Sequence, residues 1–330
     1  MRIVIPGGSG QVGRILARYF HAGGHQVTVL SRHPRPEPWP VAAWDGRASG
    51  DWQAHLEGAD VCINLAGRSV NCRYTAANRR GIRESRTQTT LLLNHAIAAL
   101  RRPPRLWINA STATIYRHSL DRAMDEASGE LGGHEPGAPD TWNFSIEVAK
   151  AWEAAFFATP TPRTRKVAIR SAMTFSPDRG GVFDVFSTLV RRGLGGPQGD
   201  GRQFVSWIHE TDFARAIEFL IAREEFSGLV NVASPNPLPN REFMRALREA
   251  WGRRAGLPTP RWLLEIGAFL IRTESELALK SRCVVPGRLL AAGFEFRYPE
   301  WSAAARDLAA RAQAAPQKVS AVRNTLTAKK

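Results

Sequence analysis

Met1-Arg-Ile-Val-Ile-Pro6 and the Gly7-Gly-Ser-Gly-Gln-Val-Gly13 that follows it open the chain and decide its fold. The apolar run before Gly7 predicts a short buried strand, and residues 14–21 predict a helix. A second apolar strand is expected over residues 26–30. The glycines therefore stand in the turn between a strand and a helix, within a β-turn-α-β unit.

Each glycine of this turn has its own physical role. Gly7 permits the tight turn, Gly10 lets the backbone approach a pyrophosphate, and Gly13 lets the helix pack closely against the strand. The helix N-terminus adds unpaired N–H groups and a partial positive charge. We therefore expect a dinucleotide to be bound by Gly7, Gly8, Ser9, Gly10, Gln11, Val12 and Gly13. The alternative is a glycine-rich turn that only packs.

The order of the remaining elements predicts the fold class. Helices are expected at residues 76–100 and 142–158, and further strands at 41–44, 60–67, 105–112 and 166–173. Because strands alternate with helices, we expect an α/β fold, a Rossmann-type doubly wound parallel sheet with helices on both faces.

Two domains are expected. Residues 1–235 would form the nucleotide-binding Rossmann domain, and residues 236–330 a small, mainly helical C-terminal lobe on the substrate side. The lobe would contain helices at 240–254 and 261–279. Its polar, basic end is expected to fray from about residue 317.

Composition narrows the choice of partners and location. The net charge is +15 over 330 residues, and the arginines that carry it are scattered. Scattered charge attracts phosphorylated ligands, but a nucleic-acid partner is disfavoured without a basic stripe and aromatic platforms. The spacing of the three cysteines fits no zinc site, so no metal is expected. We expect a cytoplasmic protein without a membrane partner, since no signal pattern or membrane-length apolar run is present.

Several motifs together carry a family resemblance. They are Gly7-Gly-Ser-Gly-Gln-Val-Gly13, Asn64-Leu-Ala-Gly67, Ser85-Arg86, Gly193-Leu-Gly-Gly-Pro197, Gly201-Arg-Gln203, Ser206-Trp-Ile-His209 with Asp212, and Pro286-Gly-Arg-Leu-Leu-Ala-Ala-Gly-Phe-Glu-Phe296. Over about residues 1–310 the chain resembles the extended short-chain dehydrogenase/reductases. It is most similar to their atypical, YfcH-like branch of nucleoside-diphosphate-sugar-epimerase-like proteins. The resemblance implies an NADP-binding domain, a lobe that closes over a small-molecule substrate, and a homodimer paired through the helices from Ala76 and Trp142.

The end of the second strand predicts the choice of nicotinamide cofactor. Sites that prefer NAD usually place an acid there, to bind the ribose 2′-hydroxyl. Here that place holds Ser31 and Arg32, and a guanidinium can pair with a 2′-phosphate. We therefore expect NADP(H), the alternative being that Arg32 is a solvated surface arginine.

Two further segments are expected at the cofactor. Asp45 stands where related proteins touch the adenine amine, although it also suits a turn before Gly46. Leu65, Ala66 and Gly67, next to Asn64, are expected to line the ribose and phosphate side through backbone contacts. Gly67 would otherwise be only a turn that ends a strand.

The catalytic residues implied by the resemblance are incomplete. Short-chain dehydrogenases use a Tyr four residues before a Lys on one helix face, with a Ser or Thr after the fifth strand. Lys150 and Thr112 match two of these positions, but Ile146 stands where the Tyr is expected. Isoleucine cannot transfer a proton, so ordinary reductase chemistry is in doubt. Lys150 is expected either to act in catalysis or to serve only in holding the cofactor ribose.

Substitutes for the missing acid, and a substrate contact, are expected elsewhere. Tyr116 follows the fifth strand, and His209 is a candidate because a histidine ordinarily titrates near neutrality. The alternatives are a pocket-capping aromatic for Tyr116 and a structural histidine for His209. Arg202, after a glycine-rich loop, is either a grip for an anionic substrate group or a surface arginine.

Two functions follow from these residues. The first is an NADP(H)-dependent epimerase or oxidoreductase acting on a carbonyl or sugar-like small molecule. The alternative is a catalytically weak or inactive NADP(H)-binding sensor or partner-binding protein. The missing tyrosine leaves both open.

Overall fold

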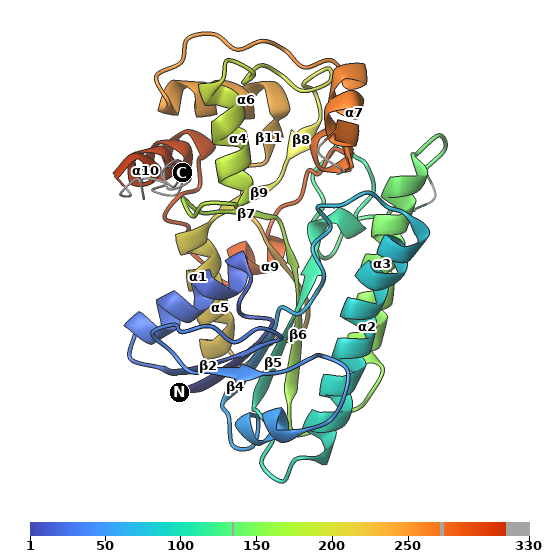
Figure 1. Ribbon diagram of the computed structural model, residues 1–330, viewed down its shortest axis with the longest axis vertical. Coiled ribbons are helices and arrows are strands. Elements are labelled where there is room, and N and C mark those ends of the chain that lie inside the picture. Colours follow the sequence, from blue (N-terminus) through green and yellow to red (C-terminus); the bar gives the residue numbers. More distant parts are fainter. Residues whose placement is uncertain (134, 271–273, 315–330) are drawn as a thin grey trace, which may run out of the picture.

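A seven-stranded parallel sheet forms the centre of the molecule (Figure 1). The computed structural model describes residues 1–133, 135–270 and 274–314, so the expected fraying from residue 317 lies outside the described residues. The strand order is β10-β6-β5-β4-β1-β2-β3, and every pair is parallel. The strands are β1 (Arg2–Pro6), β2 (Gln26–Ser31), β3 (Val41–Ala43), β4 (Val61–Asn64), β5 (Leu106–Thr112), β6 (Arg165–Ser171) and β10 (Gly228–Val232). The predicted α/β, doubly wound parallel fold is confirmed.

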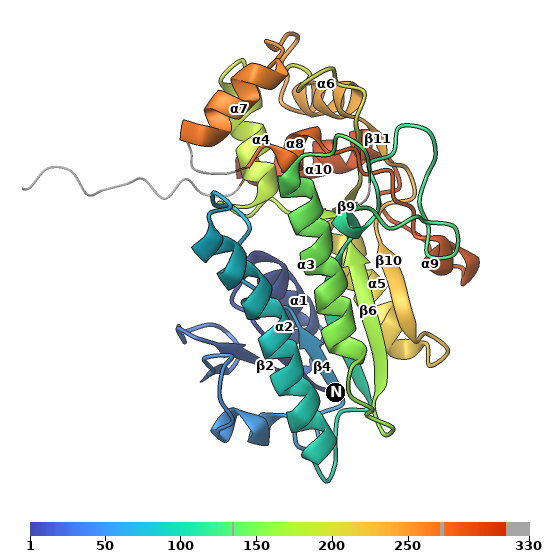
Figure 2. The same cartoon turned by 90° about the vertical axis from the view of Figure 1, so that its right-hand side faces the viewer.

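Helices cover both faces of this sheet because its strands send alternate side chains to opposite sides. On β1, Ile3 and Ile5 enter a core with α1 (Gln11–Ala22) and α5 (Glu210–Ala222). Val4, between them, enters the opposite core with α2 (Ala76–Ala99) and α3 (Asp140–Phe157). Figure 1 shows the two helix pairs on either side of the sheet, and in Figure 2 α2 and α3 run along it side by side.

A smaller lobe lies beyond the carboxyl ends of the strands (Figure 1). Its core packs Phe175, Phe243 and Trp301 together, with the Phe243 and Trp301 rings stacked at 4.2 Å. Its elements are β7 (Met173–Phe175), α4 (Val182–Arg191), β8 (Phe204–Val205), β9 (Trp207–His209), β11 (Leu238–Pro239), α6 (Asn240–Ala250), α7 (Arg261–Leu270), α8 (Glu276–Leu279) and α10 (Trp301–Ala314). Helix α9 (Gly287–Ala291) instead packs against β10, and two short helical turns lie at η1 (Asp51–His55) and η2 (Ala113–Ile115).

The lobe draws on chain segments from both sides of the domain boundary expected at residue 235. Phe175, Phe183 and Trp207 precede that boundary, yet their side chains belong to the same core as Phe243 and Trp301. In packing terms the lobe therefore begins near β7, about sixty residues earlier than expected. None of the described helices is long and apolar enough to cross a membrane.

Candidate functional site

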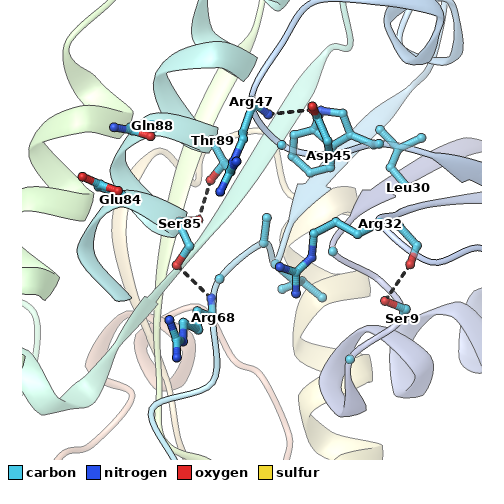
Figure 3. Close-up of a pocket in the computed structure, with 18 of the residues that line it drawn as sticks. Ser9, Leu30, Arg32, Asp45, Arg47, Arg68, Glu84, Ser85, Gln88 and Thr89 are labelled. Carbon is cyan, nitrogen blue, oxygen red and sulfur yellow. Dashed lines mark hydrogen bonds between the residues drawn. The ribbon is translucent and has the colours of Figure 1, made fainter. Parts of the chain in front are cut away.

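A cavity of about 400 Å³ opens where β1 and β4 lie side by side, at the carboxyl ends of the strands (Figure 3). The chain leaves these two strands in opposite directions along the sheet, and α/β proteins bind ligands at such a switch point. The cavity is lined by Gly7, Ser9, Gly10, Leu30, Ser31, Arg32, Trp44, Asp45, Gly46, Arg47, Leu65, Ala66, Gly67, Arg68, Gly81, Glu84, Ser85, Gln88 and Thr89. Nine of the cofactor residues predicted from the sequence are among them.

The turn after β1 lies tightly against the protein on every side except toward the cavity. Gly7 has a φ of 75°, and a Cβ there would stand 2.6 Å from the Cα of Ala66. A Cβ on Gly13 would stand 2.4 Å from the Cα of Gly8. At Gly10 the nearest atom would be 3.7 Å away, so this residue has free space beside it.

Helix α1 begins at this turn without a side-chain cap. Gly10 is the N-cap residue, and no side chain accepts a hydrogen bond from the first turn of the helix. These N–H groups and the helix dipole suit a diphosphate. Of the other residues predicted here, Val12 packs into the core, while Gln11 turns away and donates to Ser176 Oγ at 3.1 Å.

The turn after β4 is shaped by a buried asparagine. Asn64 Oδ1 accepts from the backbone N–H of Ala66 at 3.1 Å. Its Nδ2 donates to Asn109 Oδ1 at 2.7 Å, which ties the turn to β5. The polar side chain is therefore satisfied inside the protein and presents the backbone of Leu65, Ala66 and Gly67 to the cavity.

The end of β2 is cationic and offers polar hydroxyls. Ser31 Oγ donates to Ser9 Oγ at 3.0 Å, which joins the two turns that flank the cavity. Arg32 is exposed, makes no ion pair with any described residue, and points into the cavity in Figure 3. It also lines an adjoining hollow of about 280 Å³, together with Arg35 and His33. The Arg32 guanidinium and the Ser31 hydroxyl suit a 2′-phosphate.

Asp45 forms a turn and also lines the cavity. Its Oδ1 accepts from the backbone N–H groups of Arg47 at 2.8 Å and Ala48 at 3.2 Å, which makes a turn. These hydrogen bonds hold the pKa of the carboxyl below its usual value. The side chain nevertheless lines the cavity, opposite Arg32 (Figure 3).

The residues expected to act on a substrate do not line this cavity. Lys150 is half-buried on α3 and donates to the carbonyl oxygen of Gly132 at 2.7 Å. Ile146 is 1% exposed and packs beneath the same loop, where a Cβ on Gly132 would stand 2.8 Å from its Cδ1. Thr112 Oγ1 accepts from the N–H of Thr114 at 3.2 Å.

Tyr116 lies within the protein and neither reaches nor caps the cavity. It is 2% exposed; its hydroxyl donates to Asn231 Oδ1 at 2.9 Å and accepts from Arg170 Nη1 at 3.0 Å. Arg170 in turn makes two 2.8 Å bonds to Glu153. The geometry thus gives Tyr116 a place in a buried polar network rather than that of a proton donor at the cavity.

His209 and Arg202 also lie away from the cavity. His209 is completely buried; its Nδ1 accepts from the N–H of Thr211 and its Nε2 lies 3.0 Å from Asp307 Oδ2. His209 therefore caps the start of α5 and connects that helix to α10, as expected of a structural histidine. Arg202 is exposed on the lobe, and none of the described cavities includes it.

Burial of His209 predicts an acid-sensitive fold. Burial, only partly opposed by Asp307, lowers the pKa of His209 to about 4, from 6.5 in an unfolded chain. Between these values only the unfolded state binds the proton, so the stability present above about pH 6.5 is lost as the pH falls to 4. The expected loss in the free energy of unfolding is about 3 kcal/mol, measured by urea denaturation at each pH. His209→Asn retains a capping side chain and should flatten this slope; an unchanged slope would contradict the assignment.

Sequence reasoning missed the wall of the cavity that α2 supplies. Ser85 Oγ accepts from the N–H of Arg68 at 2.9 Å, and Thr89 Oγ1 donates to the carbonyl oxygen of Ser85 at 2.8 Å (Figure 3). Thr89 also fits under Gly46, where a Cβ would stand 2.9 Å from its Cγ2. The four-residue spacing of these hydroxyls was a usable signal, because it places both on one helix face.

Two family sequence patterns match the chain. The pattern of the NAD-dependent epimerase/dehydratase family matches residues 3–233, and that of a domain of unknown function, DUF1731, matches residues 259–308. Epimerase family protein SDR39U1 of Bos taurus is 34% identical over 314 residues, which cover 94% of this chain and 100% of that protein.

Solved structures show the same architecture. Human epimerase family protein SDR39U1, crystallised with NADPH, superposes with a TM-score of 0.82 at 32% identity, over 94% of this chain and 99% of that one. A nucleoside-diphosphate sugar epimerase from Corynebacterium glutamicum gives a TM-score of 0.70 at 28% identity, covering 93% of this chain and 58% of that one.

Proposed function

This chain belongs to the NAD-dependent epimerase/dehydratase family, and from that premise we propose that it binds NADP(H) in the cavity between β1 and β4. One observation carries the proposal. The start of α1 has no side-chain cap and has open space beside Gly10, and it faces the same cavity as Ser31 and Arg32, where the end of β2 carries no acidic residue. The NADPH in the related human structure supports it.

Each part of the cavity would hold a different part of the cofactor. The N-terminus of α1 and the turn at Gly10 would receive the diphosphate, and Arg32 with Ser31 the 2′-phosphate. Asp45 would face the adenine, and the backbone of Leu65, Ala66 and Gly67 the ribose and phosphate side. Outside this cavity, Lys150 on α3 would hold the nicotinamide ribose. The bound cofactor would supply hydride transfer to or from a carbonyl.

We infer as the first function an epimerase or oxidoreductase that acts on a carbonyl or sugar-like small molecule. The family supports this function, and Thr112 at the end of β5 would orient the substrate oxygen. Ile146 cannot donate a proton, and the Tyr116 hydroxyl is buried and bonded to Asn231. Both observations favour the second candidate, an NADP(H)-binding sensor or partner-binding protein with little turnover. A homodimer paired through α2 and α3 suits either function and is tested by light scattering.

Two kinds of measurement test these functions in order. Calorimetric titration with NADPH tests the binding, and no heat of binding at millimolar ligand would overturn the proposal. Two turnover assays then separate the candidates: NADPH consumption followed by absorbance over a panel of ketones and aldehydes, and epimer formation from nucleotide sugars followed by chromatography, because an epimerase consumes no cofactor. Turnover of any panel member supports the enzyme; binding without turnover supports the sensor.

A further inference from the structure

Arg86 on α2 is a half-buried cation that lies behind Gly67, a residue that lines the cavity. Its Nη1 donates to the carbonyl oxygens of Arg68 and Ile82, both at 3.0 Å. Its guanidinium lies over the ring of Trp152, 5.1 Å from the centroid. It pairs with no carboxylate of the described residues. Partial burial lowers its pKa to about 10.

The other edge of the guanidinium is unused. Nε and Nη2 of Arg86 make no hydrogen bond within the described part of the chain, and neither is sealed from solvent. These two nitrogens form the fork that binds a carboxylate or phosphate through two parallel hydrogen bonds. Arg170 uses the same fork on Glu153, with both bonds at 2.8 Å. At Arg86 the described chain supplies no such acid.

Gly67 separates Arg86 from the interior of the cavity. A Cβ on Gly67 would stand 3.2 Å from Cζ of Arg86, so the guanidinium lies directly against this glycine. Gly67, Arg68 and Ser85 all line the cavity. A cation that no described carboxylate neutralises favours an anionic partner, and Gly67 places this one directly beside the cavity.

We propose that Arg86 binds an oxyanion, a phosphate or carboxylate group, of a ligand held in this cavity. The inference rests on the proposed function and deepens it. Two ligands can bring such a group: NADP(H), through the phosphate on its nicotinamide side, and a substrate that carries its own acid. The absence of a side chain at position 67 gives either group room to reach the fork.

The test compares Arg86→Gln with Arg83→Gln, an exposed arginine of the same helix as the matched control. Calorimetry would measure NADP⁺ and adenosine 2′,5′-bisphosphate, which lacks the nicotinamide half. If the cofactor is the source, Arg86→Gln weakens NADP⁺ roughly 10- to 100-fold and the bisphosphate less than about twofold. If the substrate is the source, NADP⁺ is unaffected. Inorganic phosphate titrated into the NADP⁺-saturated protein then binds the variant about tenfold more weakly or worse.

Equal affinities of wild type and Arg86→Gln in both titrations would overturn the inference, as would an equal loss in Arg83→Gln. Should Arg86→Gln fail to fold, Arg86→Lys keeps the cation without the fork and is expected to show the same pattern of loss. A wild-type protein that binds no NADP⁺ would overturn the proposed function and this inference with it. Wild-type affinities of Arg86→Gln and Arg86→Lys for both NADP⁺ and inorganic phosphate would overturn this inference alone.

Discussion

Gly13→Ala is expected to destabilise the protein by roughly 3 kcal/mol or more. The added Cβ would stand 2.4 Å from the Cα and 2.5 Å from the carbonyl oxygen of Gly8, so backbone atoms would have to move. Helix α1 would then shift from the sheet that it covers. Urea denaturation would measure the loss, and a variant as stable as the wild type would contradict the close packing seen here.

Gly10→Ala is the matched control within the same turn. Its Cβ would meet only the carbonyl oxygen of Gly7, at 3.7 Å, so the fold is expected to lose about 1 kcal/mol or less, mainly from the weaker N-cap. NADPH affinity should nevertheless fall about tenfold or more, because the methyl group would stand where the backbone approaches the diphosphate. The two variants are therefore expected to separate a glycine needed for folding from a glycine needed for binding.

Arg32→Ala is expected to weaken NADPH by roughly 10- to 150-fold and NADH by less than about threefold. The guanidinium makes no ion pair within the described chain, so its removal leaves no buried acid and should not disturb the fold. Calorimetry with the two cofactors measures the ratio directly. Equal losses for both would mean that Arg32 does not read the 2′-phosphate.

Arg35→Ala provides the comparison for this result. Arg35 lines the adjoining hollow with Arg32 but does not line the main cavity. Its replacement should change the affinity for NADPH less than about twofold. A larger loss in Arg35→Ala than in Arg32→Ala would transfer the 2′-phosphate contact to Arg35.

The fold and the nucleotide half of the site could be predicted because they depend on local sequence. The turn after β1 is complete within thirteen residues, and each glycine acts on atoms of its own or the adjacent turn. The alternation of apolar strands with helices was enough to predict the parallel sheet. The family resemblance drawn from these motifs is confirmed.

The surroundings of the residues expected to act on a substrate could not be predicted, because they depend on contacts between distant segments. The hydroxyl of Tyr116 is held by residues 54 and 115 positions away in the chain, and nothing near it in sequence indicates that it is used there. Lys150 is likewise directed to Gly132, in a loop whose path has no local signal.

Helix α4 of the lobe is not predicted from the sequence, because its apolar residues are mostly aromatic or β-branched, a composition equally typical of a strand.

The interleaved origin of the lobe core has a consequence for the whole molecule. The chain enters the lobe at β7, returns to the sheet for α5 and β10, and enters the lobe again at β11. Cutting the polypeptide at residue 235 would leave each fragment with half of one apolar interior, so neither half is a self-sufficient module. Heat or denaturant is therefore expected to unfold the sheet and the lobe in one cooperative transition. For the same reason, the lobe is not expected to occur in other proteins without this sheet.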